Sequence, residues 1–394
     1  MSTPTTQTPI PCWFMRGGTS RGPFFRATDL PADTAIRDAV LLAVMGSPDP
    51  RQIDGLGGAH PLTSKVGIVS RSERPGVDLD FLFAQLQPDG DTVDTTPNCG
   101  NMLAAVVPFA VESGLFEPTD DTTTATVLVL NTGTSARVTV QTRAVVGGRA
   151  MSYAGDARID GVPGTAAPVT IEFLDTAGSV AASMLPTGHV RDTVDLPGVG
   201  PVEVTCIDNG MPLVILAASA VGAAGDETPA QLNADEPLKE RIQALRLRAA
   251  ELMGLGDVTS RPYPKMTLVS PPRAGGSIAT RSFIPHVCHE AVGVLAAVTV
   301  GTASVLPGTV AADVAVIADT GSPDGEVGSP DGAVTVSVEH PTGEFTVTLG
   351  TDPQDPTRVT RSALLRTARL LMRGEVLVPR AVWDPTVTST RRTT

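Results

Sequence analysis

The sequence has 394 residues, a net charge of −13, and 41% hydrophobic and 18% charged residues. A chain of this length exceeds one typical hydrophobic core, so we expect two domains. The acidic balance argues against binding to nucleic acid or to an anionic membrane surface, because both attract a basic footprint. No apolar stretch reaches the roughly 20 residues that span a bilayer, and no signal-peptide pattern is present, which predicts a cytoplasmic protein.

In the first half, residues 99–114 are apolar nearly all round, which predicts a helix buried on every face. Residues 127–145 alternate between apolar and polar side chains with a turn in the middle, and residues 202–207 alternate in the same way. Both patterns predict strands.

In the second half, apolar residues recur at helical spacing over 238–252, and residues 361–374 are expected to form another helix. Residues 288–306 are apolar all round and predict a second buried helix. Residues 321–332 repeat a turn-forming pentapeptide and predict a solvated loop, and residues 332–350 predict a hairpin.

Two segments of the chain share an order of residues. Residues 64–76 read SKVGIVSRSERPG and residues 264–276 read PKMTLVSPPRAGG, and in both an aliphatic residue and Val-Ser follow a Lys. A cysteine follows each segment, Cys99 and Cys288, and each is expected to open one of the apolar helices. The repeat predicts two related domains facing a cleft, where both helix N-termini favour negative charge.

Cys99 and Lys65 are the candidate reactive groups. Free cysteines are more often buried and inert, but Cys99 lies in NCGN, directly before the apolar helix, with a glycine that permits close approach of a ligand. Most lysines are solvated surface charges, whereas Lys65 lies between a polar turn and an apolar strand, which suits a base.

The segment MRGGTSRG, residues 15–22, is either a surface turn or a carboxylate-binding loop, because arginine binds carboxylates in a bidentate fork. It lacks the ending of a phosphate-binding P-loop, and residues 54–61 do not match a dinucleotide fingerprint, so no nucleotide cofactor is expected. The five histidines show no metal-binding pattern. His289 follows Cys288 and could bind an acidic substrate or relay a proton.

Together with LTSKVGIVS, NCGNM, IDNGMP, PKMTLVS and RSFIPHVCHEA, these residues resemble the PrpF family over nearly the whole chain. The resemblance implies an α+β fold of two similar domains of the diaminopimelate epimerase-like fold, residues 1–184 and 185–394. Each domain is expected to wrap a mixed β-sheet around a central apolar helix, with the active site in the cleft between them. The last strand, about 376–394, could pack on either domain.

The resemblance also implies cofactor-independent proton transfer in a small tricarboxylate, with the family's functional Lys and Cys at Lys65 and Cys99. The strings CIDNGMP, TRSFIPHVCH and EHPTGEFTV favour keto–enol tautomerisation of 4-oxalomesaconate in gallate breakdown. The alternatives are an aconitate or 2-methylaconitate isomerase and, in a different class, a non-catalytic tricarboxylate-binding accessory protein. Epimerisation by Cys99 and Cys288 as paired thiols is disfavoured, because their neighbouring residues differ. A homodimer is compatible with the sequence.

Three carboxylates need cations, which we expect from both halves of the chain. Arg21 stands where the family is associated with Lys, so the preference for a particular substrate is the property most affected. The expected binding residues are Arg16, Gly17, Gly18, Thr19, Ser20, Arg21, Ser64, Asn98, Gly100, Asn101, Met211, Lys265, Arg281, Ser282 and His289.

Overall fold

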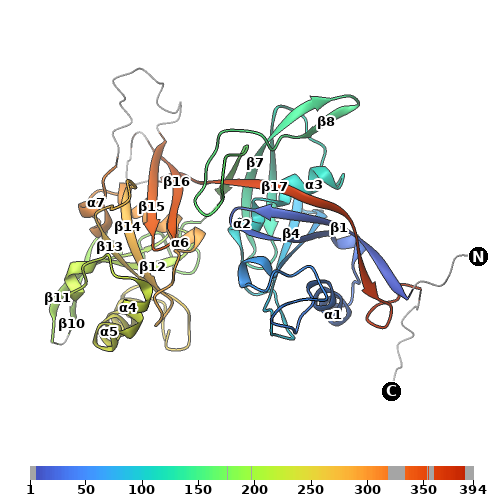
Figure 1. Cartoon of the computed structure of the whole chain (residues 1–394). Coiled ribbons are helices and arrows are strands. Elements are labelled where there is room, and N and C mark those ends of the chain that lie inside the picture. The colour runs from blue at the N-terminus through green and yellow to red at the C-terminus, as the bar shows by residue number, and fades with distance from the viewer. Residues whose placement is uncertain are drawn as a thin grey trace, which may run out of the picture. The chain divides into compact units, whose positions relative to one another are not determined.

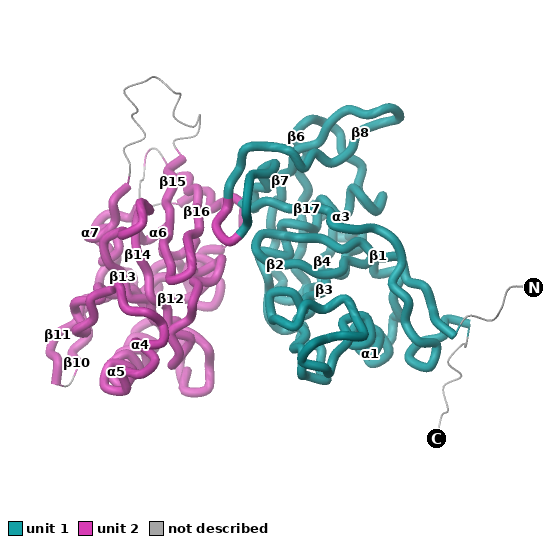
Figure 2. The backbone as a smooth tube through the Cα atoms, in the orientation of Figure 1, with its two compact units in different colours: residues 1–158, 162–171, 366–394 teal, residues 159–161, 172–365 magenta. Residues whose placement is uncertain are grey.

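The computed structural model describes residues 6–174, 176–196, 198–317, 333–352, 354 and 359–386. The chain forms two compact units, coloured separately in Figure 2. Unit 1 comprises Met1–Arg158, Val162–Ile171 and Arg366–Thr394, and unit 2 comprises Ile159–Gly161 and Glu172–Leu365.

These units differ from the expected ranges 1–184 and 185–394. Residues 172–184 group with unit 2, and residues 366–394 group with unit 1. The physical reason for the second difference is that the last long strand, β17 (Val359–Pro379), pairs over residues 368–379 with the first strand of the chain.

Unit 1 is built on a mixed sheet (Figure 1). Antiparallel pairs join β17 to β1, β1 to β2, β3 to β4 and β6 to β7, and parallel pairs join β2 to β3 and β4 to β6. Because β9 pairs with both β7 and β17, the sheet closes into a barrel. The strands are β1 (Gln7–Gly17), β2 (Ser20–Arg26), β3 (Lys65–Arg71), β4 (Leu79–Leu86), β5 (Val93–Asp94), β6 (Thr122–Val129), β7 (Thr134–Val145), β8 (Gly148–Met151), β9 (Pro168–Phe173) and β17.

The apolar segment predicted over 99–114 is helical, in two pieces. Helix α2 (Gly100–Leu103) packs against β1 and β2, and α3 (Val106–Glu112) packs against β3, β7 and β8. The first five residues of α3 are fully buried, as expected for a helix that is apolar on every face. A third helix, α1 (Thr34–Met45), begins at the N-cap Asp33, whose carboxylate accepts a hydrogen bond from the Ile36 backbone N–H.

Unit 2 runs through the same series of strand pairings. The pairs β11–β12, β13–β14 and β15–β16 are antiparallel, whereas β12–β13 and β14–β15 are parallel. The same alternation occurs from β1 to β7 in unit 1. The strands are β10 (Asp192–Leu196), β11 (Gly200–Asp208), β12 (Pro212–Ala217), β13 (Lys265–Ser270), β14 (Ile278–Phe283), β15 (Val334–His340) and β16 (Gly343–Thr351).

The helices of unit 2 are α4 (Pro229–Ala234), α5 (Glu236–Leu252), α6 (Val294–Val305) and α7 (Val310–Val314). Helix α6 is buried along most of its length and packs against β11, β12, β15 and β16. Helix α6 follows β14 in the chain. In unit 1, α2 follows β4 in the same way, with only the short β5 between them. The internal repeat of the sequence therefore has a counterpart in the order of elements.

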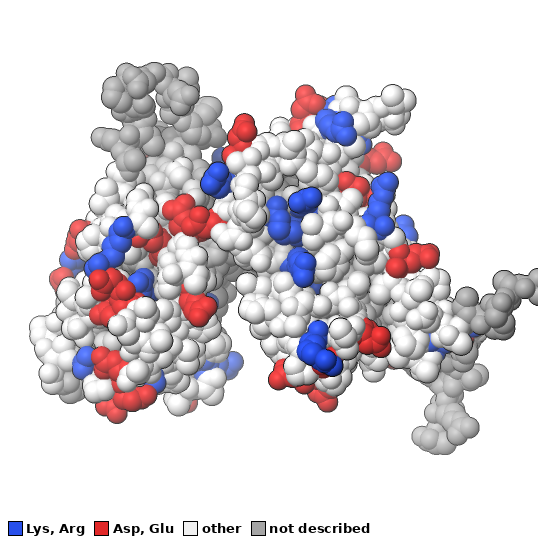
Figure 3. Space-filling model, viewed as in Figure 1, with Lys and Arg blue, Asp and Glu red and all other residues white. Residues whose placement is uncertain are grey.

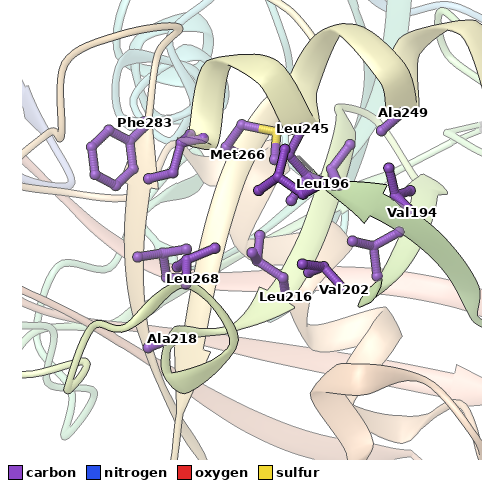
Figure 4. Close-up of a cluster of buried hydrophobic side chains, with 14 of the residues drawn as sticks. Val194, Leu196, Val202, Leu216, Ala218, Leu245, Ala249, Met266, Leu268 and Phe283 are labelled. Atoms are coloured by element: carbon purple, nitrogen blue, oxygen red, sulfur yellow. The ribbon is translucent and has the colours of Figure 1, made fainter. Parts of the chain in front are cut away.

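The main core of unit 2 lies between α5 and its sheet (Figure 4). Leu245 and Ala249 of α5 point toward Leu196 and Met266 on the strands, and all four side chains are at most 2% exposed. Burying one leucine side chain contributes about 2–3 kcal/mol. The predicted helix over 238–252 is confirmed, and Asp235 caps it by accepting a hydrogen bond from the Leu238 N–H.

The strands predicted over 127–145 and 202–207, and the hairpin over 332–350, are confirmed as β6 and β7, β11, and β15 and β16. The helix predicted over 361–374 is wrong, because these residues lie in β17. Their leucine, alanine and arginine content favours a helix, but hydrogen-bonding partners on β16 and β1 override that propensity. The loop predicted over 321–332 lies outside the described residues. In the described part of the chain, no helix is both long and apolar enough to cross a membrane.

Candidate active site

The turn between β1 and β2 packs directly on the first turn of α2. A Cβ atom added to Gly17 would lie 3.1 Å from the Ala105 Cβ and closer still to the Asn101 carbonyl oxygen. Gly18 has a φ of +51°, and a Cβ there would collide with the Asn101 side chain. Only residues without a side chain permit this approach, so the two glycines of the RGGTS segment set the position of α2.

The NCGN segment forms the start of α2. Cys99 is the N-cap residue, is half-buried, and accepts a hydrogen bond at its carbonyl oxygen from the Leu103 N–H. Asn98 is exposed and Gly100 is half-buried. The Asn101 Nδ2 donates to the Thr19 Oγ1 at 3.0 Å, which ties the helix to the β1–β2 turn.

Lys65 is the first residue of β3 and is 8% exposed. Its Nζ donates to the Gln85 Oε1 at 2.6 Å and lies 5.0 Å from the centroid of the Phe83 ring. The Gln85 amide is itself fixed, because its Nε2 lies within hydrogen-bonding distance of three backbone carbonyl oxygens. The amine of Lys65 is therefore held in one orientation.

Lys65 and the start of α2 lie at the same end of unit 1. A Cβ atom on Gly22 of β2 would collide with the Lys65 carbonyl oxygen and would lie 3.5 Å from the Met102 Cε of α2. The β1–β2 turn, four residues earlier, contacts Asn101 of the same helix. Three segments that are distant in the sequence thus converge at one end of the barrel.

The other predicted residues of this end differ in how free their polar groups are. Ser64 is fully buried, and its hydroxyl is within hydrogen-bonding distance of the Gln52 Oε1 and the His60 carbonyl oxygen, which suits a structural role. Ser20 is 2% exposed, and its hydroxyl makes no hydrogen bond with any described residue. Arg21 is exposed, and its guanidinium lies 5.8 Å from the centroid of the Phe14 ring.

Arg16 is partly committed to the backbone. Its Nη1 donates to the carbonyl oxygens of Gly18 at 2.9 Å and of Thr367 at 3.0 Å. Burial lowers the pKa of Arg16, and the neighbouring charge of Arg369 lowers it further. Figure 3 shows Lys and Arg side chains gathered on the part of unit 1 where Figure 1 places α2 and β17.

Arg366 lies beside the glycine turn of the candidate site, and the sequence did not reveal it. It lies on β17, is 3% exposed, and its Cδ would be 3.2 Å from a Cβ atom on Gly18. Burial lowers the pKa of Arg366 to about 9, and an electrostatic interaction with Cys99 opposes this shift. The helix predicted over 361–374 did not place Arg366 near the site, because only a strand paired with β1 brings Arg366 next to the glycine turn.

The remaining predicted residues lie in unit 2. Lys265 is the first residue of β13, and its Nζ would lie 3.6 Å from a Cβ atom on Gly293, the N-cap of α6. Burial lowers the pKa of Lys265. Partial desolvation lowers the pKa of His289, and the charge of Lys265 lowers it further. Lys265 and His289 are therefore neighbours at the start of α6.

Arg281, Ser282 and Met211 have structural contacts. The Arg281 Nε donates to the Glu227 carbonyl oxygen at 2.6 Å. Ser282 is buried, with its Oγ 3.5 Å from the Thr267 Oγ1, and the Met211 carbonyl oxygen accepts a hydrogen bond from a threonine of α6. All of these contacts lie within unit 2.

The expectation that Cys288 opens the second apolar helix is wrong, because α6 begins after Gly293. Cys288 forms an isolated bridge with Phe283, and its N–H donates to the Asn233 Oδ1 at 2.7 Å, which holds it against the sheet. It is 2% exposed, and burial raises its pKa to about 11. The predicted cleft between the two halves concerns the relative placement of the units and stays a prediction.

Among the described residues, no group of three or more His, Cys, Asp or Glu side chains could hold a metal ion. The groups that gather in unit 1 are an amine, a thiol, guanidinium groups and backbone amides. Such a set can move a proton and stabilise the negative charge that develops beside it.

Comparison with known proteins identifies the class. The family model described as PrpF protein matches residues 7–379. A (4E)-oxalomesaconate Delta-isomerase of Novosphingobium sp. (strain KA1) is 54% identical over 93% of this chain and 97% of its own length. A 4-oxalomesaconate tautomerase of Pseudomonas putida (strain KT2440) is 48% identical over 96% of this chain and 98% of its own length.

A solved structure supports the same conclusion. The crystal structure of methylitaconate-delta-isomerase matches with a TM-score of 0.81 and 33% identity, over 98% of this chain and 100% of that one. These relatives define the protein as an isomerase, and its mixed sheets and closed barrel agree with the match to the solved structure. The chain belongs to the PrpF family.

Proposed function

We propose that this chain isomerises 4-oxalomesaconate by keto–enol tautomerisation in the breakdown of gallate. The observation that carries the proposal is the convergence of Lys65, Cys99 and the RGGTS turn at one end of unit 1. The substrate is suggested by two relatives, at 54% and 48% identity, whose names contain oxalomesaconate. Moving one proton needs no cofactor beyond these side chains.

In the proposed reaction Lys65 is the base. The base is the deprotonated form of the amine, which can donate one N–H to Gln85 and use its nitrogen lone pair to take a proton from the methylene beside the ketone. The electron pair of the broken C–H bond forms the new C=C bond, and the carbonyl oxygen becomes an enolate. Cys99, at the start of α2, polarises this oxygen or donates the proton that completes the enol.

A second reaction uses the same groups. The relative at 54% identity is named a Delta-isomerase. In an allylic isomerisation the same base removes a proton from carbon, the double bond moves by one position, and a proton returns to the far carbon. Both reactions therefore begin with proton removal by Lys65, and they differ in the atom that receives the proton.

The test follows 4-oxalomesaconate by ultraviolet absorbance and by proton NMR in D₂O. Tautomerisation predicts faster keto–enol interconversion and deuterium uptake at the methylene, whereas allylic isomerisation predicts a product with a displaced double bond. We expect Lys65→Ala to lose at least about a hundredfold in kcat. Cys99→Ser is expected to lose rate with little change in KM. If wild-type protein does not accelerate either reaction over buffer, the proposed substrate is wrong.

We also propose that each unit is one copy of the diaminopimelate epimerase-like fold, with its apolar helix at the centre. The matching series of strand pairings supports this, as does the equivalent place of α2–α3 and α6 in the two series. Expressing each unit alone would not test this proposal, because β17 contributes residues to both units. Superposing the two units of an experimentally determined structure would test it.

A further inference from the structure

The β17 strand brings an arginine beneath the glycine turn of the candidate site. Arg366 is 3% exposed, and the neighbouring Thr367 carbonyl oxygen accepts hydrogen bonds from the Gly18 N–H at 2.9 Å and from Arg16 at 3.0 Å. The Arg366 Cδ would be 3.2 Å from a Cβ atom on Gly18. The guanidinium is therefore placed by the same contacts that position the turn against α2.

A buried guanidinium acts more strongly on its neighbours than an exposed one, because little water screens its charge. Cys99 interacts electrostatically with Arg366, which raises the pKa of Arg366 against the larger opposing effect of burial. With a pKa of about 9, the guanidinium still carries its positive charge at neutral pH. At neutral pH a positive charge therefore acts on the candidate thiol.

A buried hydroxyl at this end points to a ligand. Ser20, on the other side of the Gly18 turn, is 2% exposed, and its hydroxyl makes no hydrogen bond with any described residue. A buried hydroxyl without a protein partner is unusual and costs free energy unless a ligand or water satisfies it. The hydroxyl can donate to an anion bound at this end of unit 1.

We propose that Arg366 is the buried cation that binds an anionic group, a carboxylate of a small molecule, beside the Cys99 thiol. That this carboxylate belongs to the isomerase substrate rests on the proposed function. Arginine suits the task because its planar fork matches a carboxylate in two parallel hydrogen bonds. Arg366 thus joins Arg16 and Arg21 as a cation of this end of unit 1, and it is the most buried of the three.

The test compares two alkylating reagents that react with the same thiol, anionic iodoacetate and neutral iodoacetamide. In both, the sulfur forms a bond to the CH₂ carbon and iodide leaves. Reactivity of the thiol affects both rates alike, so their ratio reports the attraction of the anion. The labelled peptide is identified by mass spectrometry. Cys12, Cys206 and Cys288 are at most 2% exposed, and Cys99→Ser should abolish fast labelling.

We expect Arg366→Met to lower the iodoacetate-to-iodoacetamide ratio at Cys99 by about tenfold. Arg366→Lys should retain part of the ratio, since the charge remains while the fork is lost. The matched control is Arg373→Met, which removes an exposed arginine further along the same strand, beside Glu112, and should leave the ratio unchanged. A ratio that is unchanged in folded Arg366→Met protein, or that falls equally in the control, overturns the proposal.

A second measurement covers the case in which Arg366→Met does not fold. Tricarballylate, a simple tricarboxylate, should slow alkylation of Cys99 in the wild-type protein, and chloride at equal ionic strength should not. Protection should be weaker in Arg366→Lys, and absence of protection in the wild type overturns the proposal. Because no isomerisation is measured, a failure of the proposed reaction and a failure of this proposal are distinguishable.

Discussion

Replacing Gly17 with Ala tests whether the glycine turn positions the reactive groups. The added methyl would lie 3.1 Å from the Ala105 Cβ and 3.2 Å from the Ala105 nitrogen, where 3.4–4 Å is ordinary contact. It would lie under 3.0 Å from the Asn101 carbonyl oxygen, so α2 or the turn must move by about 1 Å. A displacement of that size costs roughly a hundredfold in rate, equivalent to about 2.7 kcal/mol.

The assay is steady-state isomerisation of 4-oxalomesaconate, combined with urea unfolding of the same variant. We expect kcat/KM to fall about a hundredfold, while overpacking lowers the free energy of unfolding by about 1–3 kcal/mol. The control is Gly374→Ala on β17, where an added Cβ meets nothing within 4 Å. If Gly17→Ala folds and keeps the wild-type rate, the turn does not set the position of α2.

Three further changes test single contacts. Gln85→Leu removes the acceptor of Lys65, and we expect turnover to fall at least about tenfold; an unchanged rate would show that Gln85 does not orient the amine. Burial lowers the pKa of Lys265 in the folded protein, so between that pKa and 10.5 the unfolded chain binds more protons and the free energy of unfolding rises with pH. Lys265→Met should remove this rise, which urea unfolding at several pH values measures. An unchanged pH dependence would contradict the lowered pKa of Lys265. Asn209→Ala removes buried hydrogen bonds to Thr302 and Ser362. In the same assay it should lower the free energy of unfolding by about 1–3 kcal/mol. A decrease below about 0.5 kcal/mol would mean that water replaces the lost hydrogen bonds.

The part of the site that the sequence predicted consists of short continuous segments. The RGGTS turn and the NCGN segment are each read from adjacent residues, and the structure brings Thr19 and Asn101 into hydrogen-bonding contact. Glycines at a tight approach and a cysteine before an apolar helix have local signatures. Candidate residues that lie together within one short segment can therefore be predicted from the sequence.

Arg366 could not be found in this way, because its role depends on pairing across most of the chain. Arg16 of β1 lies opposite Arg369 of β17, more than 350 positions later. The local sequence RSALLRTARLLMRG has helical composition, and only the partners supplied by β16 and β1 make it a strand. The same dependence explains why residues 366–394 group with unit 1.

The repeat of the sequence duplicates the backbone without duplicating the chemistry. Lys65 begins β3, which pairs in parallel with β2, and Lys265 begins β13, which pairs in parallel with β12. The backbone positions of the two lysines therefore correspond. Their side chains do not: Lys65 donates to Gln85, whereas Lys265 neighbours His289 at the start of α6. The cysteines diverge further, since Cys99 is the N-cap residue of α2 and is half-buried, while burial raises the pKa of Cys288 to about 11. A mechanism with two interchangeable thiols needs one thiolate as base and one thiol as acid, and each must reach the substrate and take either role. Cys288 is 2% exposed, and burial disfavours its thiolate, so proton transfer by unlike groups fits these residues better.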